Sequence, residues 1–383
     1  MSRINELIKE LCPNGVIYKK YGDVFEIKTG KGITTKEATD DGLYPIISGG
    51  TTPMGYYHSY NRDENIVTVS RVGANAGYVN FITEKFYLND KCFSIIPKDE
   101  FVKCFIPKYI YHYTKNIENK IMELQSEGGV PTINTQKVSN LLMPMLPIDV
   151  QLEIITVLDK FGELEVELEA ELEARKNQYE FWRGKIINMY DSKNIKLSDM
   201  AKIYDGTHST PNYQENGIPF ISVENISNIY GTNKFISKED YKKYKIKPEI
   251  NDVFMTRIGT IGKCSVLEKQ IDLAYYVSLA LIRPNTEIIL PKYLKYVIES
   301  NIGKDELYKR TLVHAVPIKV NKDEIGKIVL PVPSIDDQKK IISKLDKFES
   351  LTESNSSGLP AEIELRRQQY EYYRNKLLNF EVL

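Results

Sequence analysis

The chain repeats itself at close to half its length, and this repeat constrains the fold more than any local motif does. Leu158-Asp159-Lys160-Phe161 recurs 187 residues later as Leu345-Asp346-Lys347-Phe348. Arg-Lys-Asn-Gln-Tyr-Glu at residues 175–180 recurs as Arg-Arg-Gln-Gln-Tyr-Glu at residues 366–371, now 191 residues later. The second copy therefore has four extra residues between the two matched stretches. A duplication of this length predicts two similar structural units joined in one chain.

The best-matched part of each copy has the pattern of a long amphipathic helix. Residues 149–190 contain no proline, and apolar residues recur at heptad positions. At 1.5 Å per residue, about 40 helical residues would span roughly 60 Å. The second copy is broken by Ser356-Ser357-Gly358-Leu359-Pro360 and then resumes. We expect the two helices to pack antiparallel as a stalk. The residues predicted for this role are Leu158, Phe161, Leu168, Leu172, Tyr179, Trp182, Ile186, Leu345, Phe348, Tyr370, Tyr373 and Leu377.

The less well-matched part of each copy is rich in Gly, Tyr, Thr and Ile, with short β-prone runs at residues 65–70 and 252–257. The predicted fold class is α+β, with two similar domains of twisted strands, loops and short helices. Two long antiparallel coiled-coil-like helices separate them, in a pseudo-twofold internal repeat. The predicted boundaries are 1–147 for the first domain, 148–190 for the first helix, 191–333 for the second domain and 334–383 for the second helical region.

The composition is that of an ordinary globular protein. Apolar residues make up 42% of the 383 residues, and the longest apolar runs fall far short of the roughly 20 residues that a membrane helix needs. Cys12, Cys92, Cys104 and Cys264 include no Cys-x-x-Cys pair, so free thiols and no metal site are expected. The N-terminus lacks a basic-then-apolar signal pattern, so a cytoplasmic location is expected.

The charge is unevenly distributed along the chain. The net charge is -1, but residues 153–173 hold eight acidic residues and one lysine, or -7. The remaining residues therefore carry +6. Because the distribution of charge matters more than its sum, the near-neutral total does not exclude a nucleic-acid partner.

Catalytic motifs are missing from the sequence. It has no phosphate-binding Gly-x-x-x-x-Gly-Lys-Ser/Thr loop, no Gly-x-Ser-x-Gly nucleophile turn and no Asn/Asp-Pro-Pro-Tyr/Phe tetrapeptide of adenine methyltransferases. His58, His112, His208 and His314 are far apart in the sequence. We therefore expect no catalytic residues, no bound metal and no cofactor in this chain.

Both variable segments instead offer glycine-rich polar loops. Such loops let the backbone approach DNA closely, and hydroxyl, amide and cationic side chains contact base edges and phosphates. Two bland alternatives remain: the glycines make ordinary turns, and the arginines lie in solvent. Tyr56, Tyr57, Tyr275 and Tyr276 either stack on bases or pack in the core, with the core favoured. The predicted DNA-binding residues are Lys31, Thr34, Thr35, Lys36, Ser48, Thr51, Thr52, Arg71, Asn75, Thr207, His208, Ser209, Thr210, Arg257 and Thr260.

The helical motifs resemble those of specificity subunits of type I restriction–modification systems, and within them a type IC-like class. The resemblance rests on Leu330-Pro331-Val332-Pro333 with Gln338, on the repeated Leu-Asp-Lys-Phe motif, on residues 358–366 and on residues 369–374. It covers essentially the whole chain, although the variable domains match only in outline. Leu141-Leu142-Met143-Pro144 departs from the proline-spaced pattern at Leu330, which blurs the first domain boundary.

The resemblance implies that each variable domain is a target-recognition domain that reads one half of an asymmetric, two-part site in double-stranded DNA. It also implies that two modification subunits dock on the helices and carry S-adenosylmethionine and the adenine-N6 methylation, and that restriction subunits join them. The main alternative is a helical adaptor whose variable domains bind protein, which the acidic segment favours. A third is an enzyme, which the missing motifs disfavour.

Overall fold

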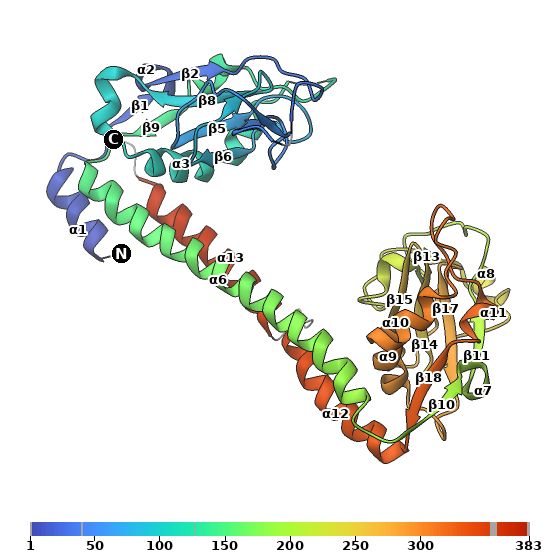
Figure 1. The fold of residues 1–383 in the computed structure, drawn as a ribbon. Helices are drawn as coiled ribbons and strands as arrows, with labels where there is room; N and C mark the ends of the chain where they lie inside the picture. Colours follow the sequence, from blue (N-terminus) through green and yellow to red (C-terminus); the bar gives the residue numbers. More distant parts are fainter. Residues whose placement is uncertain (1, 40, 127, 353–357, 381–383) are drawn as a thin grey trace. The chain divides into compact units, whose positions relative to one another are not determined.

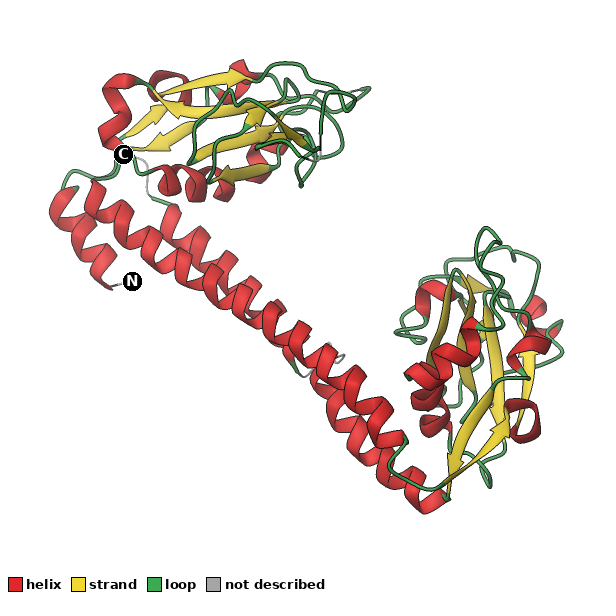
Figure 2. Ribbon diagram, in the orientation of Figure 1, coloured by secondary structure: helices red, strands yellow, loops and turns green. Residues whose placement is uncertain are grey.

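A computed structural model describes residues 2–39, 41–126, 128–352 and 358–380. Its contacts divide the chain into two compact units: Met1–Leu168 with Ile363–Leu383, and Glu169–Glu362. Each unit contains one mixed domain and a stretch of paired helices, as the ribbons show (Figures 1 and 2). The α+β prediction is confirmed, as are the two similar domains and the long helix (Figure 2).

The domain of the first unit is built from three small sheets. The central sheet has the order β2-β8-β5-β6, and a second sheet has the order β4-β3-β7, with β3 and β7 parallel. A third sheet pairs β1 with β9. The strands are β1 (Tyr18–Lys20), β2 (Phe25–Thr29), β3 (Tyr44–Ile47), β4 (Tyr56–Tyr57), β5 (Ile66–Ser70), β6 (Val79–Ile82), β7 (Tyr87–Leu88), β8 (Cys92–Pro97) and β9 (Leu142–Pro144).

The domain of the second unit repeats this topology strand for strand. Its sheets have the orders β11-β17-β14-β15, β13-β12-β16 and β10-β18, so each strand matches the one nine places earlier. The strands are β10 (Ser192–Lys196), β11 (Ala201–Asp205), β12 (Ile218–Ile221), β13 (Phe235–Ile236), β14 (Val253–Ile258), β15 (Thr260–Val266), β16 (Ala274–Tyr275), β17 (Leu279–Pro284) and β18 (Val329–Pro333). The strands predicted at residues 65–70 and 252–257 are β5 and β14.

Short helices complete each domain. In both, a helix that begins at a proline packs on the central sheet: α3 (Pro107–Asn116) on β5 and β6, and α9 (Pro291–Glu299) on β14 and β15. Proline suits the first turn of a helix because the N–H that proline lacks would have no intrahelical partner there. The other short helices are α1 (Ser2–Leu11), α2 (Tyr21–Val24), η1 (Asp99–Cys104), α4 (Glu118–Met122), α5 (Thr135–Val138), α7 (Leu197–Met200), η2 (Val223–Asn225), α8 (Lys238–Lys242), α10 (Asn301–Tyr308) and α11 (Lys322–Ile325).

The long helix α6 (Ile148–Ile187) pairs with a different helix in each unit. In the first unit it runs antiparallel to α13 (Leu359–Leu378). Two contacts show this direction: Phe161 stacks on Tyr373, and the later residue Glu165 binds the earlier residue Arg367. In the second unit it runs antiparallel to α12 (Ile335–Thr352), where Tyr179 stacks on Phe348. Of the predicted helix break, Ser356 and Ser357 lie outside the described residues, and Gly358 precedes α13 with a φ of 113°.

The buried faces of the long helices belong to the cores of the domains. Ile154 and Leu158 of α6 join the core of the first unit, together with Leu377 of α13. Ile186 of α6 and Leu345 of α12 join the core of the second. In the described part of the chain, no helix is both long enough and apolar enough to cross a membrane.

Candidate nucleic-acid interface

The loop that follows the first strand of each central sheet lies against backbone in both domains. A Cβ on Gly30 would lie 2.1 Å from the carbonyl oxygen of Leu88, and one on Gly206 would lie 2.5 Å from that of Tyr276. Lys31 donates its backbone N–H to the Leu88 oxygen at 2.9 Å. Thr207, in the matching position, donates to the Tyr275 oxygen at 3.1 Å. Only glycine fits this close approach, so both loops hold the same path.

The loops that carry the two arginines are held by matching backbone hydrogen bonds. The backbone N–H of Arg71 donates to the carbonyl oxygen of Lys91, and the carbonyl oxygen of Arg71 accepts the N–H of Ile133. The backbone N–H of Arg257 donates to the carbonyl oxygen of Ser278, and the carbonyl oxygen of Arg257 accepts the N–H of Val320. Two residues further on, Gly73 and Gly259 have left-handed φ angles of 103° and 77°, and both donate to a nearby loop. The backbones of Arg71 and Arg257 therefore occupy equivalent places in the two domains, as expected from the repeat.

In the first domain, a third loop joins this group. Asn75 donates from its side-chain amide to the Gly49 oxygen at 3.0 Å, and a Cβ on Gly49 would lie 2.8 Å from the oxygen of Val72. Ser48, which precedes Gly49, is buried at 8% exposure. The structure thus brings the Ser48–Thr52 segment and the Arg71–Asn75 segment together.

Most of the predicted contact residues are exposed on these loops. Thr34 is engaged by Glu37, which accepts from its N–H and its hydroxyl at 2.9 and 2.8 Å. Thr207 is half-buried, and its hydroxyl accepts the N–H of Ser209 at 3.2 Å. The exposed ones are Lys31, Thr34, Thr35, Lys36, Thr51, Thr52, Asn75, His208, Ser209, Thr210 and Thr260.

The side chains of the two arginines have different surroundings. Arg71 is half-buried, and its guanidinium reaches a backbone oxygen of Asp90 at 3.5 Å. Arg257 is only 7% exposed and forms an ion pair with Asp205. Thr29 stands where the second domain has Asp205. The second arginine is therefore held inward by a carboxylate that the first domain lacks.

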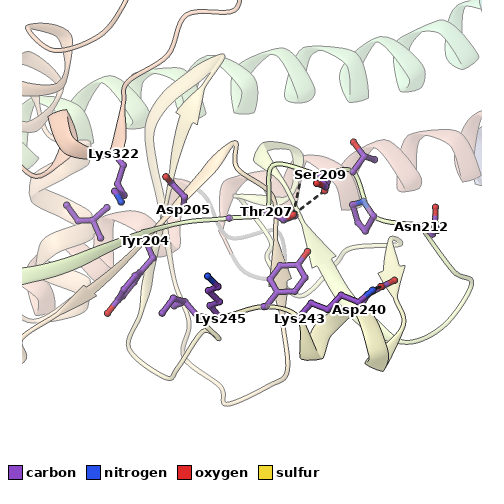
Figure 3. Close-up of a pocket in the computed structure, with 15 residues that line it drawn as sticks. Tyr204, Asp205, Thr207, Ser209, Asn212, Asp240, Lys243, Lys245 and Lys322 are labelled. Carbon is purple, nitrogen blue, oxygen red and sulfur yellow. Dashed lines mark hydrogen bonds and ion pairs between the residues drawn. The ribbon is translucent and has the colours of Figure 1, made fainter.

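A hollow of about 630 Å³ opens beside the Thr207 loop in the second domain (Figure 3). Tyr204, Lys243, Lys245 and Lys322 line it together with Thr207. These four residues are not among those predicted from the sequence to bind DNA. Lys322 lies on α11, more than a hundred residues from the loop, so no local pattern could connect them.

Two of the cysteines are buried in the domains. Burial raises the pKa of the Cys92 thiol to about 11, and burial also holds the pKa of Cys264 far above its usual value. Both thiols are therefore protonated at neutral pH and poor nucleophiles. No three histidine, cysteine or carboxylate side chains gather as metal ligands within the described ranges.

The predicted stalk residues are all buried or half-buried. Leu158, Tyr179, Ile186, Leu345 and Leu377 are buried. Half-buried residues complete the set: Phe161, Leu168, Leu172, Trp182, Phe348, Tyr370 and Tyr373. Their heptad spacing thus corresponds to packing within each unit.

Comparison with known proteins gives a consistent result. The sequence model of the family described as "Type I restriction modification DNA specificity domain" matches residues 13–175 and 189–365. The chain is 30% identical over 290 residues to the type I restriction enzyme EcoR124I/EcoR124II specificity subunit of Escherichia coli, covering 71% of this chain and 70% of that protein. A putative type I restriction enzyme specificity subunit of Haemophilus influenzae is 27% identical, with 87% of each chain covered.

Solved structures share the fold. A type I restriction–modification S subunit from M. genitalium matches 95% of this chain and 96% of its own, with a TM-score of 0.54 and 17% identity. A chain from a study of complex assembly and conformational transition of the type I R-M system matches 96% of this chain and 98% of its own, with a TM-score of 0.63 and 14% identity. From the two matched domains and the relatives across its length, the chain belongs to the type I restriction–modification DNA specificity family and is a specificity subunit of that class.

Proposed function

We propose that this subunit reads a two-part, asymmetric site in double-stranded DNA, with one half-site for each domain. We also propose that it scaffolds two adenine-N6 methyltransferase subunits and, through them, restriction subunits. One observation carries the proposal of a two-part site. The same three-sheet frame holds the same pair of loops in both domains, yet the side chains on those loops differ.

The difference in side chains supports an asymmetric site. At matched positions the first domain has Thr29 and Lys31, whereas the second has Asp205 and Thr207. A constant frame with different donors and acceptors would read different base edges, because each base pair presents its own pattern in the major groove. The protein itself is expected to be non-catalytic, as proteins of its family are.

The loop residues divide by chemistry into two proposed roles. Lys31 and Lys36 suit phosphate contacts, which set affinity and register. Arg71 and Asn75 have the donor geometry that suits guanine and adenine edges. The hydroxyls of the first domain and those of Thr207, Ser209, Thr210 and Thr260, with His208, would supply further base contacts. For Arg257 we propose a supporting role through its bond to Asp205.

The outer faces of the long helices are the proposed docking surface for the modification subunits, which would bring S-adenosylmethionine. The heptad residues are already occupied by packing inside each unit, so a partner would contact the side chains that remain outside. Phe181 on α6 and Tyr372 on α13 stand at matching places in the repeat and are 54% and 57% exposed. The type IC-like class and a cytoplasmic location stay predictions.

The experiment is to co-express the subunit with the modification subunit encoded beside it and to map methylated adenines across the genome. We expect a two-part motif. The triple variant Thr207→Ala, His208→Ala and Ser209→Ala should alter or abolish one half of that motif and leave the other unchanged. In the first domain, Thr34→Ala with Thr35→Ala should affect the other half. Loss of both halves from either variant, or an unsplit motif, would contradict the assignment of one half-site to each domain. An absence of salt-dependent DNA binding would favour the adaptor hypothesis instead.

A further inference from the structure

The edge of the central sheet in the second domain borders two hollows that share residues. β11 is the first strand of that sheet, and the helix α11 lies against it. The hollow of about 630 Å³ beside the Thr207 loop and a second hollow of about 480 Å³ are both lined by Ile203, Tyr204 and Lys322. The two hollows therefore adjoin along β11. This arrangement suits an extended ligand better than a compact one.

Lysines with no protein partner line this path. Within the described part of the chain, no ion pair or hydrogen bond is recorded for the ammonium groups of Lys202, Lys245 and Lys322. In Figure 3, Lys245 and Lys322 point toward the hollow from opposite sides. Lysine ammonium groups this exposed are ordinarily solvated, but three along one path concentrate positive charge there.

The carboxylates nearby neutralise other cations. Asp240 binds Lys243 at 2.6 Å, Glu324 binds Lys327 at 2.5 Å, and Asp205 binds Arg257. Asp323 also lines the second hollow and offsets part of the charge. The balance along the path stays positive, at three unpaired lysines against one aspartate.

The walls add groups that suit a sugar–phosphate chain. Thr207, Ser209 and Thr210 bring hydroxyls to the rim of the larger hollow, and Tyr204 and Tyr244 bring rings. Hydroxyl donors and ammonium groups are the usual partners of phosphate oxygens in DNA complexes. The rings offer apolar surface for deoxyribose.

The first domain has the same fold but carries less positive charge at two of the matching positions. Glu26 is the second residue of β2 and lies opposite Ile96, and Lys202 is the second residue of β11 and lies opposite Arg283. Glu26 therefore stands where the second domain has Lys202. The first residue of α5 is Thr135, whereas the first residue of the matching α11 is Lys322. Two of the three unpaired lysines are thus replaced by an acidic and a neutral residue. Among the described residues, the positive charge at these two positions is therefore found in the second domain and not in the first.

We propose that this path, formed by Lys202, Lys245 and Lys322, binds the phosphodiester backbone of DNA next to the half-site read by the second domain. The inference rests on the proposed function, because it assumes that this domain meets DNA through the adjacent Thr207 loop. It adds that the two domains hold DNA unequally: the second domain contributes extra contacts that are independent of sequence.

The test measures how DNA binding by the assembled complex depends on salt. Each lost phosphate contact lowers the slope of log K against log salt by about 0.9. Lys245→Gln with Lys322→Gln should therefore lower the slope by about 2 and weaken binding to cognate and scrambled duplexes by the same factor. The matched control is Lys193→Gln with Lys263→Gln, which removes the same charge from exposed lysines of the second domain outside both hollows.

The possible results distinguish a DNA backbone path from base reading, from a small-anion site and from failure of the proposed function. Equal slopes for the lysine pair and the control pair would overturn the DNA path. A change in the methylated motif caused by the lysine pair would show base reading instead and would also overturn it. Saturable binding of ATP or inorganic phosphate that these lysines control, with an unchanged DNA slope, would assign the hollow to a small anion. If the unmodified complex does not discriminate cognate DNA, the proposed function fails before the lysines are tested.

Discussion

At the scale of single residues, Arg71 and Arg257 share a backbone position but differ in one neighbour. Asp205 pairs with Arg257, whereas Thr29 stands in that place in the first domain. The inward orientation of Arg257 is therefore set by an ion pair and not by the path of its loop. The two arginines should respond differently to the same substitution.

We expect Arg71→Ala to weaken binding to its half-site by about 1 to 3 kcal/mol, the usual cost of a lost base contact, with little change in stability. Arg257→Ala should also destabilise the second unit, because it leaves Asp205 without its partner. Asp205 is about a quarter exposed, so we expect about 1 to 2 kcal/mol rather than the larger cost of a fully buried pair. Thermal unfolding and DNA titration of both variants measure this. An Arg257→Ala protein with full stability and reduced half-site binding would mean that its guanidinium reads DNA.

We expect His112 to make the stability of the first unit depend on pH. Burial lowers the pKa of His112 below its usual 6.5, and the hydrogen bond that its Nε2 donates to Asp159 opposes this only in part. The folded domain therefore resists a proton that the unfolded chain accepts, so stability is present above pH 6.5 and is lost as the pH falls below it. His112→Tyr introduces the residue of the matching position, Tyr296, whose hydroxyl donates to Asp346 at 2.5 Å.

The measurement is amide exchange of α3 at pH 7.5 and pH 5.5, corrected for the intrinsic effect of pH on exchange. Protection in the unmodified protein should fall between these values, and His112→Tyr should reduce that fall. A histidine with no influence would leave the same difference in both proteins.

At the scale of elements, a buried glutamine ties each long helix to its domain. The side-chain oxygen of Gln338 accepts the N–H of Leu290 at 2.8 Å, and its amide donates to Ile288 and Pro333 at 2.9 and 3.0 Å. Gln151, 187 residues earlier, makes the matching bonds to Ile106, Cys104 and Leu146. Both side chains are fully buried. The glutamine therefore joins three segments at the start of each helix.

We expect Gln338→Leu to destabilise the second unit by several kcal/mol, because it leaves one N–H and two carbonyl groups buried without partners, at about 1 to 3 kcal/mol each. Gln178→Leu makes the same change at an exposed position of α6 and should cost about 0.5 kcal/mol or less. Denaturant unfolding of both variants measures the difference. Equal stabilities would mean that the three segments are held by packing alone.

The outer aromatic pair tests the docking of the modification subunits. Phe181→Ala and Tyr372→Ala should each remove one modification subunit from the assembly, because the repeat places one exposed ring on each docking surface. Native mass spectrometry counts the subunits. Leu365→Ala is the control, since Leu365 is 65% exposed but its counterpart is Ala174. Full assemblies from both aromatic variants would exclude these rings from the docking contacts.

At the scale of the whole molecule, the length of α6 is predicted to set the gap between half-sites. Its middle contains Val166-Glu167-Leu168-Glu169 followed by Ala170-Glu171-Leu172-Glu173, a near-repeat of four residues inside an unbroken helix. One added unit lengthens a helix by about 6 Å and turns it by about 400°, a net rotation of about 40°. One base pair advances DNA by about 3.4 Å and turns it by about 35°. Rotation matches one pair, and the excess length can be absorbed by DNA deformation.

Insertion of Val-Glu-Leu-Glu after Glu169 should therefore keep both half-site sequences and lengthen the gap by one pair in the methylated motif. A three-residue insertion at the same place turns the helix by about 300° and should abolish methylation. An unchanged gap after the four-residue insertion would refute the prediction that the length of α6 sets the gap.

The sequence alone determined the features that depend on local order. The helical period of residues 149–190 and the strands at 65–70 and 252–257 are patterns of neighbours, and the structure confirms them. The structure also confirms the duplication, which the sequence showed as a similarity between two distant stretches. The equivalence of the Arg71 and Arg257 loops also followed from the repeat. These predictions succeeded because periodicity and glycine placement act over a few residues.

Only the tertiary structure decided what surrounds those residues. The helices of the stalk share the cores of the domains, so contacts divide the chain within α6 and α13 rather than at the ends of the long helices. Asp205 reaches Arg257 across 52 residues, and Lys322 joins Lys245 from a distant helix. Such contacts depend on how a sheet brings remote segments side by side. No local pattern in the sequence encodes that, and so the orientation of Arg257 and the lysine path became visible only in the folded chain.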